Sequence, residues 1–207
     1  MQLPSKKKKM KILIDNGHGY DTKGKCSPDG LFKEYRWTRQ AAQKIVSLLA
    51  FMGYDAELLV KEENDISLQE RCRRVNYWCS KLGKDNVLLI SMHVNAAGSD
   101  GKWHTATGWS AYTTRGITKA DYLARCLYKE AEKHLVGYKI RKYGHMDLDW
   151  DYEENFYILM HTYCPAVLIE NFFQDNKEDV KFLSSVTGMQ KCCEIVIDGL
   201  VGYFKEK

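Results

Sequence analysis

Three side chains in this sequence follow short apolar runs and belong to types that bind metals or move protons. They are His18, His93 and Glu170. Ligands of open α/β sheets bind beyond the carboxyl ends of the strands, so these side chains are expected together at one edge of a sheet. Imidazole and carboxylate groups gathered in this way are typical of catalytic metal sites and of acid and base catalysis.

A catalytic zinc ion takes about three protein ligands from His, Asp or Glu and keeps one position open for water. His18 and His93 would supply two of them, and an acid would supply the third. The spacing leaves both Glu34 and Glu170 open as that acid. Glu34 follows a glycine-rich loop at the predicted start of a helix, whereas Glu170 ends a predicted strand in line with the two histidines, as a positioned base would.

The residues around His18 suggest how its ring is presented. Gly17 and Gly19 lack a Cβ, so the backbone is expected to turn tightly or to take positive φ at these two positions. Asp15, three residues before His18, is expected to orient the ligating ring through its second nitrogen. The competing interpretation, that the histidines are ordinary core or loop residues, is weakened because two separate predicted strands end in one.

The elements that must position these side chains alternate along the chain. Apolar residues at three- and four-residue steps, a capping-box pattern and terminal glycines predict helices, and short apolar runs predict strands. Strands that alternate with helices of this length predict a three-layer α/β/α single domain with a largely parallel central sheet. The predicted helices span 34–52, 67–82 and 118–135, with two more after 176, and the predicted strands span 12–14, 54–60, 87–93, 108–113 and 166–170.

Composition bounds the class of protein. The 207 residues suffice for one domain with a substantial core, and the net charge of +4 is accounted for by the four lysines at positions 6–9. We therefore expect a disordered basic tail over 1–9, a formally neutral folded domain over 10–207, and no nucleic-acid binding. No apolar run approaches the roughly 20 residues of a transmembrane segment, and seven cysteines without CxxC spacing favour reduced thiols.

One stretch, 137–163, loses the regular pattern and is crowded with aromatic and acidic residues. Long irregular segments in compact domains are often walls or lids of functional sites. Asp147, Asp149 and Asp151 imitate the start of a calcium loop, but the positions that need Gly and Glu hold other residues, so calcium is excluded there.

Taken together, these motifs resemble the zinc-dependent N-acetylmuramoyl-L-alanine amidases of the type-3 amidase family, from Lys11 onward. Five blocks in the family's order carry the resemblance. They are Ile14 to Gly19, Gly30 with Glu34, Ser67 and Leu68 with Arg71 and Asn76, Ser91 to Ala96, and Pro165 to Glu170 with Asn176.

The resemblance implies that His18, Glu34 and His93 bind Zn²⁺ and that Glu170 is the catalytic acid and base. Two further residues are expected near the site on their own merits. Arg71 would fix a carboxylate or backbone carbonyls, and Asn95, just past His93, would hold its loop or hydrogen-bond the substrate.

The implied function is a peptidoglycan hydrolase that cleaves the amide between N-acetylmuramic acid and L-alanine with a zinc-activated water. Peptidoglycan or a muropeptide would be its substrate, and we expect a monomer. A zinc carboxypeptidase-like peptidase and a non-catalytic cell-wall-binding protein are the alternatives. The absence of a recognisable leader fits a phage or prophage endolysin that stays in the cytoplasm until it is released to the cell wall. A periplasmic or extracellular enzyme whose leader has been removed fits nearly as well.

Overall fold

The computed structural model describes residues 10–143 and 150–205. The predicted basic tail of residues 1–9 lies outside them, as do Asp147 and Asp149 of the aspartate triplet. The described chain forms a six-stranded sheet with the order β2-β1-β3-β6-β4-β5. The strands are β1 (Lys11–Asn16), β2 (Asp55–Leu58), β3 (Val87–Asn95), β4 (Ser110–Thr113), β5 (Tyr152–Glu153) and β6 (Ala166–Phe173).

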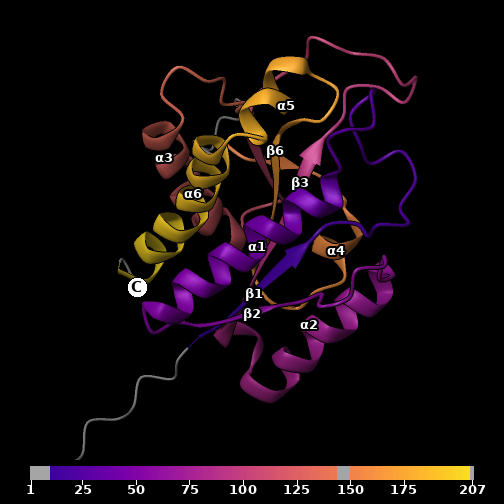
Figure 1. Ribbon diagram of the computed structural model, residues 1–207. Helices are drawn as coiled ribbons and strands as arrows, with labels where there is room; N and C mark the ends of the chain where they lie inside the picture. The colour runs from indigo at the N-terminus through magenta and orange to yellow at the C-terminus, as the bar shows by residue number, and fades with distance from the viewer. Residues whose placement is uncertain (1–9, 144–149, 206–207) are drawn as a thin grey trace, which may run out of the picture.

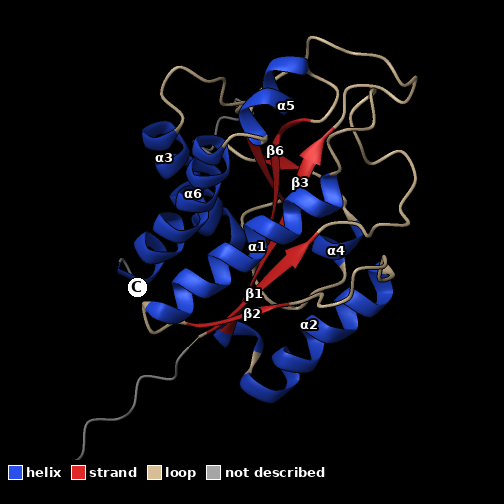
Figure 2. Ribbon diagram, in the orientation of Figure 1, coloured by secondary structure: helices blue, strands red, loops and turns tan. Residues whose placement is uncertain are grey.

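Helices cover both faces of this sheet (Figures 1 and 2). On one face lie α1 (Glu34–Phe51), α3 (Lys119–His134) and α6 (Val186–Lys205), and on the other lie α2 (Leu68–Leu82) and the short α4 (Tyr157–Met160). The remaining helices are α5 (Lys177–Leu183), which follows β6, and the single 3₁₀ turn η1 (Lys84–Asn86). The predicted three-layer α/β/α architecture is confirmed.

The sheet is buried on both faces because each face meets its own hydrophobic cluster. Along β1, Ile12 and Ile14 pack toward α1 and α6, while Leu13 packs toward α2. Strands buried on both sides read as continuous apolar runs rather than alternating ones, which is why the sequence of β1 and β3 is so uniformly apolar. None of the described helices combines the length and the apolar character needed to cross a bilayer.

Two strands run against the others. β1, β2, β3 and β6 are mutually parallel, whereas β4 pairs antiparallel with β6, and β5 follows the direction of β4. The prediction of a largely parallel sheet therefore holds. The reversal of β4 also places its first residue, Ser110, directly opposite Glu170.

Strand ends differ from the prediction in a way that concerns the site. β3 continues to Asn95 and β6 to Phe173, so His93 and Glu170 lie inside paired strands rather than at their ends. The register between the strands shifts after His93, and Phe172 adopts a positive φ of 62° within this irregularity. Sequence periodicity does not reveal such a bulge, because the extra residue depends on how two strands distant in the sequence pair with each other.

Candidate active site

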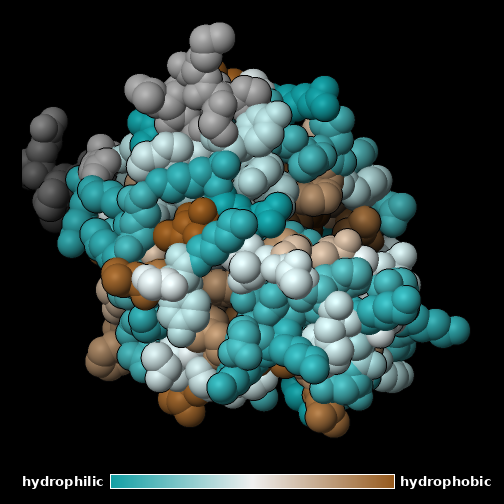
Figure 3. Space-filling view, turned by 90° about the horizontal axis from the view of Figure 1, so that it is seen from above, coloured by the Kyte–Doolittle hydropathy of each residue, from teal (hydrophilic) through white to brown (hydrophobic). Residues whose placement is uncertain are grey.

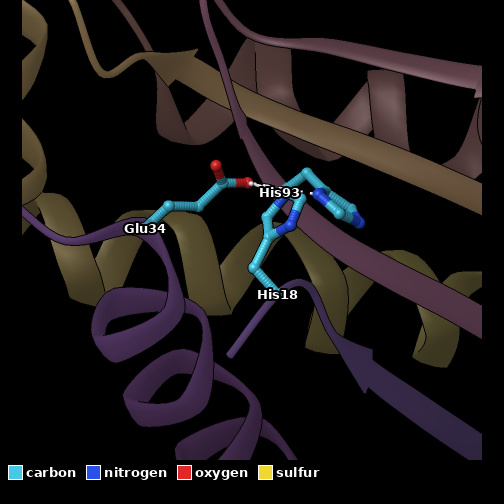
Figure 4. A group of neighbouring side chains, drawn as sticks. All are labelled: His18, Glu34 and His93. Atoms are coloured by element: carbon cyan, nitrogen blue, oxygen red, sulfur yellow. Dashed lines mark hydrogen bonds and ion pairs between the residues drawn. The ribbon is translucent and has the colours of Figure 1, made fainter. Parts of the chain in front are cut away.

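Three side chains from separate segments converge at the carboxyl edge of the sheet (Figure 4). His18 follows β1, Glu34 begins α1, and His93 belongs to β3. Glu34 Oε1 lies 3.1 Å from His93 Nδ1 and 3.4 Å from His18 Nε2. One ligand atom from each residue lies within 4.8 Å of the other two, which is the geometry of a group that can hold a metal ion.

His18 is held by its backbone as well as by its ring. Its φ is 63°, in the left-handed region that few residues other than glycine adopt, although His, Asn and Asp are enriched there. The carbonyl oxygen accepts hydrogen bonds from Arg39 Nη1 at 2.8 Å and Arg71 Nη2 at 3.4 Å. Positive φ was expected at Gly17 or Gly19, but neither glycine adopts it, and the left-handed residue of this turn is His18.

The two glycines serve close approach instead. A Cβ on Gly17 would lie 2.3 Å from Cε1 of the His93 ring. A Cβ on Gly19 would lie 1.9 Å from the backbone nitrogen of Asp65. Because real Cβ atoms do not approach other atoms so closely, glycine at position 17 makes room for the second histidine of the group.

Glu34 is fully buried, and its position is fixed by the backbone of the neighbouring strand. Oε1 accepts a hydrogen bond from the amide of Val94 at 2.9 Å, and the Glu34 amide itself donates to the carbonyl of Lys25 at 3.1 Å. Its other oxygen, Oε2, is buried without a hydrogen-bond partner among the described residues. A carboxylate in the first turn of a helix is also favoured by the helix dipole.

The three groups tune one another's ionisation. Burial lowers the pKa of His18 to about 4, against a weaker opposing effect of the Glu34 charge. Burial also opposes ionisation of Glu34, but the hydrogen bond and charge of His93 outweigh it, so the pKa of Glu34 lies below its ordinary value. These shifts favour an uncharged His18 and an ionised Glu34, as metal ligands require. At His93 burial is outweighed by the hydrogen bond and charge of Glu34, so the pKa of His93 is raised.

Glu170 lies beside this group on the adjacent strand, where it pairs in register with His93. Its Oε2 is shielded from solvent and has no hydrogen-bond partner among the residues that the structure describes. Burial raises the pKa of Glu170 to about 8, with a further contribution from the Glu34 charge and an opposing one from His93. A buried carboxyl with a raised pKa is suited to exchange protons near neutral pH.

Asp15 does not contact either imidazole, and the prediction that it orients the His18 ring is wrong. Its Oδ1 accepts from Arg71 Nη1 at 2.5 Å, and its Oδ2 accepts from Ser91 Oγ at 2.6 Å. The alternation of side chains along β1 directs Asp15 toward α2, whereas His18 lies beyond the turn. Arg71 meets its expectation, because it binds the Asp15 carboxylate and also donates to the carbonyls of Asn16 and His18.

Asn95 is occupied within its own loop. Its side-chain oxygen accepts from the amide of Ala96 at 2.8 Å, and its carbonyl accepts from the amide of Gln174. The sequence reasoning did not find Arg39, which clamps the carbonyl of His18, or Thr38, which donates to the carbonyl of Gly17. Both lie one turn into α1. In the sequence, a polar residue at such a position looks the same as one on a solvent-exposed helix face.

A cleft of about 470 Å³ opens beside the two histidines, between the loop after β1, the start of α2, and α4. It would give a substrate access to the site from the α2 side of the sheet. Its lining comprises Asp15, Gly17, His18, Thr22, Asp65, Ile66, Ser67, Leu68, Gln69, Arg71, His93 and Ile158.

Comparison with known proteins identifies the family. The family model described as N-acetylmuramoyl-L-alanine amidase matches residues 12–201. The chain belongs to this amidase family. The match contains all four residues of the site, His18, Glu34, His93 and Glu170.

Individual relatives of the amidase family agree with this assignment. The chain is 29% identical over 197 residues to the N-acetylmuramoyl-L-alanine amidase CwlM of Bacillus licheniformis, covering 94% of this chain and 69% of that protein. It is 26% identical to the endolysin of Bacillus phage SPP1, covering 91% and 64%. The fold matches the crystal structure of an N-acetylmuramoyl-L-alanine amidase from Clostridium difficile 630 with a TM-score of 0.78 and 24% identity, covering 97% and 99%.

Proposed function

We propose that this chain hydrolyses the amide bond between N-acetylmuramic acid and L-alanine in peptidoglycan, using a zinc ion held by His18, Glu34 and His93. One observation carries the proposal: a fully buried Glu34 carboxylate contacts two imidazoles, and Glu170 stands beside them on the next strand. Family membership supplies the reaction, and this geometry supplies the residues that would perform it.

The residues fit a zinc ion. His18 Nε2 and Glu34 Oε2 are buried without hydrogen-bond partners within the described chain, and such atoms are costly unless a further group satisfies them. Two imidazoles and one carboxylate form a donor set that zinc accepts while a position stays open. When bound, zinc would act as a Lewis acid on the amide carbonyl and would make water acidic enough to attack near neutral pH.

Glu170 would then move the proton. As a carboxylate it would take the proton of the attacking water, and as an acid it would return that proton to the departing amine. An amine leaves poorly unless it is protonated, so one residue that does both completes the cycle. A cation bound beside Glu170 would lower its raised pKa and so favour the carboxylate that the first step needs.

The face that carries the site suits a polar substrate. Figure 3 views the molecule from the carboxyl edge of β1 and β3, and the surface there is mainly hydrophilic with small, separate apolar areas. A glycan with attached peptides can reach such an open face, whereas an enclosed apolar pocket would exclude it. We infer that the domain works as a monomer on the cell wall, either as an endolysin or as a wall-remodelling enzyme.

The test uses two variants with opposite expectations for metal and activity. Glu170→Gln should retain about one zinc per chain and lose cleavage of a defined muropeptide by roughly 10²- to 10⁴-fold. His93→Ala should lose both. Metal analysis would measure the zinc content, and mass spectrometry of the products would measure cleavage. Release of a terminal amino acid instead of a free muramic acid would indicate a peptidase. Zinc-free wild type with full activity would refute the proposal.

A further inference from the structure

An arginine stands on the side of the site opposite the cleft. Arg141 lies beside the start of β4, where its amide donates to the carbonyl of Trp109 at 2.8 Å. The next residue of β4, Ser110, pairs directly with Glu170. The backbones of Arg141 and Glu170 are therefore two strand spacings of about 4.8 Å apart. An arginine side chain together with one residue of a bound substrate can span such a distance.

The arginine is held in place along its length. Its carbonyl accepts a hydrogen bond from the Tyr128 hydroxyl at 2.9 Å. Gly108, with φ 118°, leaves room for its stem, because a Cβ there would lie 3.0 Å from Arg141 Cγ. The guanidinium lies over the ring of Phe173, 5.2 Å from the ring centre. A side chain fixed in this way loses little conformational freedom when it binds a ligand.

This guanidinium has no anionic partner among the described residues. Its Nε is buried without a hydrogen-bond acceptor, while the other guanidinium groups near the site are paired: Arg71 with Asp15, and Arg39 with backbone carbonyls. Native proteins rarely leave a buried donor unsatisfied, and an exception calls for a ligand or another explanation.

Strand pairing places the arginine close to Glu170, and the side chain of Tyr112 on β4 is near both. The hydroxyl of Tyr112 accepts from Ser110 Oγ at 3.4 Å, and the charges of both Glu170 and Arg141 act on that hydroxyl. Tyr112 belongs to β4, the strand that pairs with β6 on one side and whose start accepts the Arg141 amide, so it is close to both groups. Its ring packs against Tyr152 and Phe156, with centroids 5.2 and 5.3 Å away, which builds an aromatic wall on this side.

We propose that Arg141 binds a carboxylate of the stem peptide next to the scissile amide, namely the free α-carboxylate of the residue that follows L-alanine. This inference rests on the proposed function and names its substrate preference. Planar guanidinium groups bind carboxylates through two parallel hydrogen bonds, and a neutral amide at the same place offers only one acceptor oxygen. The enzyme would therefore prefer muropeptides whose second residue is an acid over those in which it is amidated.

The experiment compares two muropeptides that differ only in that group, a carboxylate in one and a carboxamide in the other. Wild type should cleave the acid about tenfold better, through a lower KM. Arg141→Met keeps the stem over Phe173 and removes the charge, so it should raise KM for the acid about tenfold at unchanged kcat. KM for the amide, which can accept only one hydrogen bond from the guanidinium, should rise much less. Arg141→Lys should recover part of the preference. Arg125→Met, an exposed position on α3, serves as the matched control.

Binding measured without turnover separates this inference from the proposed function. Calorimetry with the Glu170→Gln protein should show tighter binding of the acid than of the amide, and the added Arg141→Met change should abolish that difference. Equal treatment of the two substrates by wild type, or an equal loss on both in Arg141→Met, would overturn the role of Arg141. Selective binding without any cleavage by wild type would instead overturn the proposed reaction and leave the arginine's role standing.

Discussion

At the scale of single residues, the missing side chain of Gly17 and the backbone of His18 both determine where the imidazoles lie. The His93 ring occupies the space where a side chain on residue 17 would begin, and the His18 carbonyl is turned toward two arginines by a left-handed backbone. Both features place the imidazoles with ring centroids 4.9 Å apart, close enough to share one ion. The space left by Gly17 is therefore a condition for metal binding.

Gly17→Ala tests that condition. The new methyl group would displace the His93 ring, because it would lie 2.3 Å from Cε1. We expect zinc content well below one ion per chain and activity reduced by more than about 100-fold, since a shift of about 1 Å in a catalytic group has effects of that size. Gly202→Ala is the control, because nothing lies within 4 Å of its Cβ position. Full zinc occupancy in Gly17→Ala would contradict the expectation.

Residue types predicted part of this site. Histidines and acids after apolar runs predicted His18, His93 and Glu170. The residues left Glu34 and Glu170 open as the third ligand, and the family resemblance selected Glu34. The prediction for Asp15 was wrong because it relied on the short distance from Asp15 to His18 along the chain. Side chains alternate between the two faces of a strand, and this alternation directs the Asp15 carboxylate to Arg71. It also passed over Arg141, whose significance depends on having no partner among the described residues, and only the fold reveals that.

At the scale of elements, one buried ion pair joins α2 to the end of β1. Arg71 is 2% exposed and Asp15 1%, and the arginine also contacts Asp65 at 3.0 Å, while the carboxylate accepts from Ser91 on β3. The Asp15 carboxylate therefore links β1, α2 and β3 next to the turn that carries His18. The pair fixes where the helix begins relative to the site.

Arg71→Met should leave the Asp15 carboxylate buried without its partner. Removing one member of a buried pair costs about 3–5 kcal/mol of unfolding free energy, which chemical denaturation would measure. Arg73 lies two residues further along α2, and its side chain is 69% exposed. Arg73→Met should change stability little, although Arg73 also pairs with a carboxylate. Equal stability of the two variants would show that the pair does not anchor α2.

Element boundaries were predictable where local chemistry marks them. The Ser67 side chain accepts from the Glu70 amide at the start of α2, and Thr118 forms a capping box with Asp121 at the start of α3. The reversed direction of β4 and the bulge near Phe172 were not predicted, because both depend on pairing between distant segments. The irregular stretch after residue 137 also contains β5 and α4, two elements too short to show a periodic pattern.

At the scale of the whole molecule, the proposed metal would join segments that are far apart in the sequence. A ligand that binds only the folded state adds about 2.7 kcal/mol of stability at 100 times its Kd. For a domain of this size, zinc should raise the melting temperature by roughly 5–10 °C, and a chelator should reverse the rise. His18→Ala should abolish the shift and His161→Ala, an exposed residue, should keep it. Scanning calorimetry with and without zinc would decide, and an unchanged wild-type melting temperature would count against the metal.

The strand order also has a consequence for synthesis on the ribosome. His18, Glu34 and His93 all belong to the first half of the chain, whereas Glu170 arrives on β6, which inserts between β3 and β4. Domains generally fold as units. The three proposed ligands therefore leave the ribosome well before the residue that would move the proton, and the sheet can be completed only after β6 has emerged to enter its centre. We expect hydrolytic activity only once that late strand is in place.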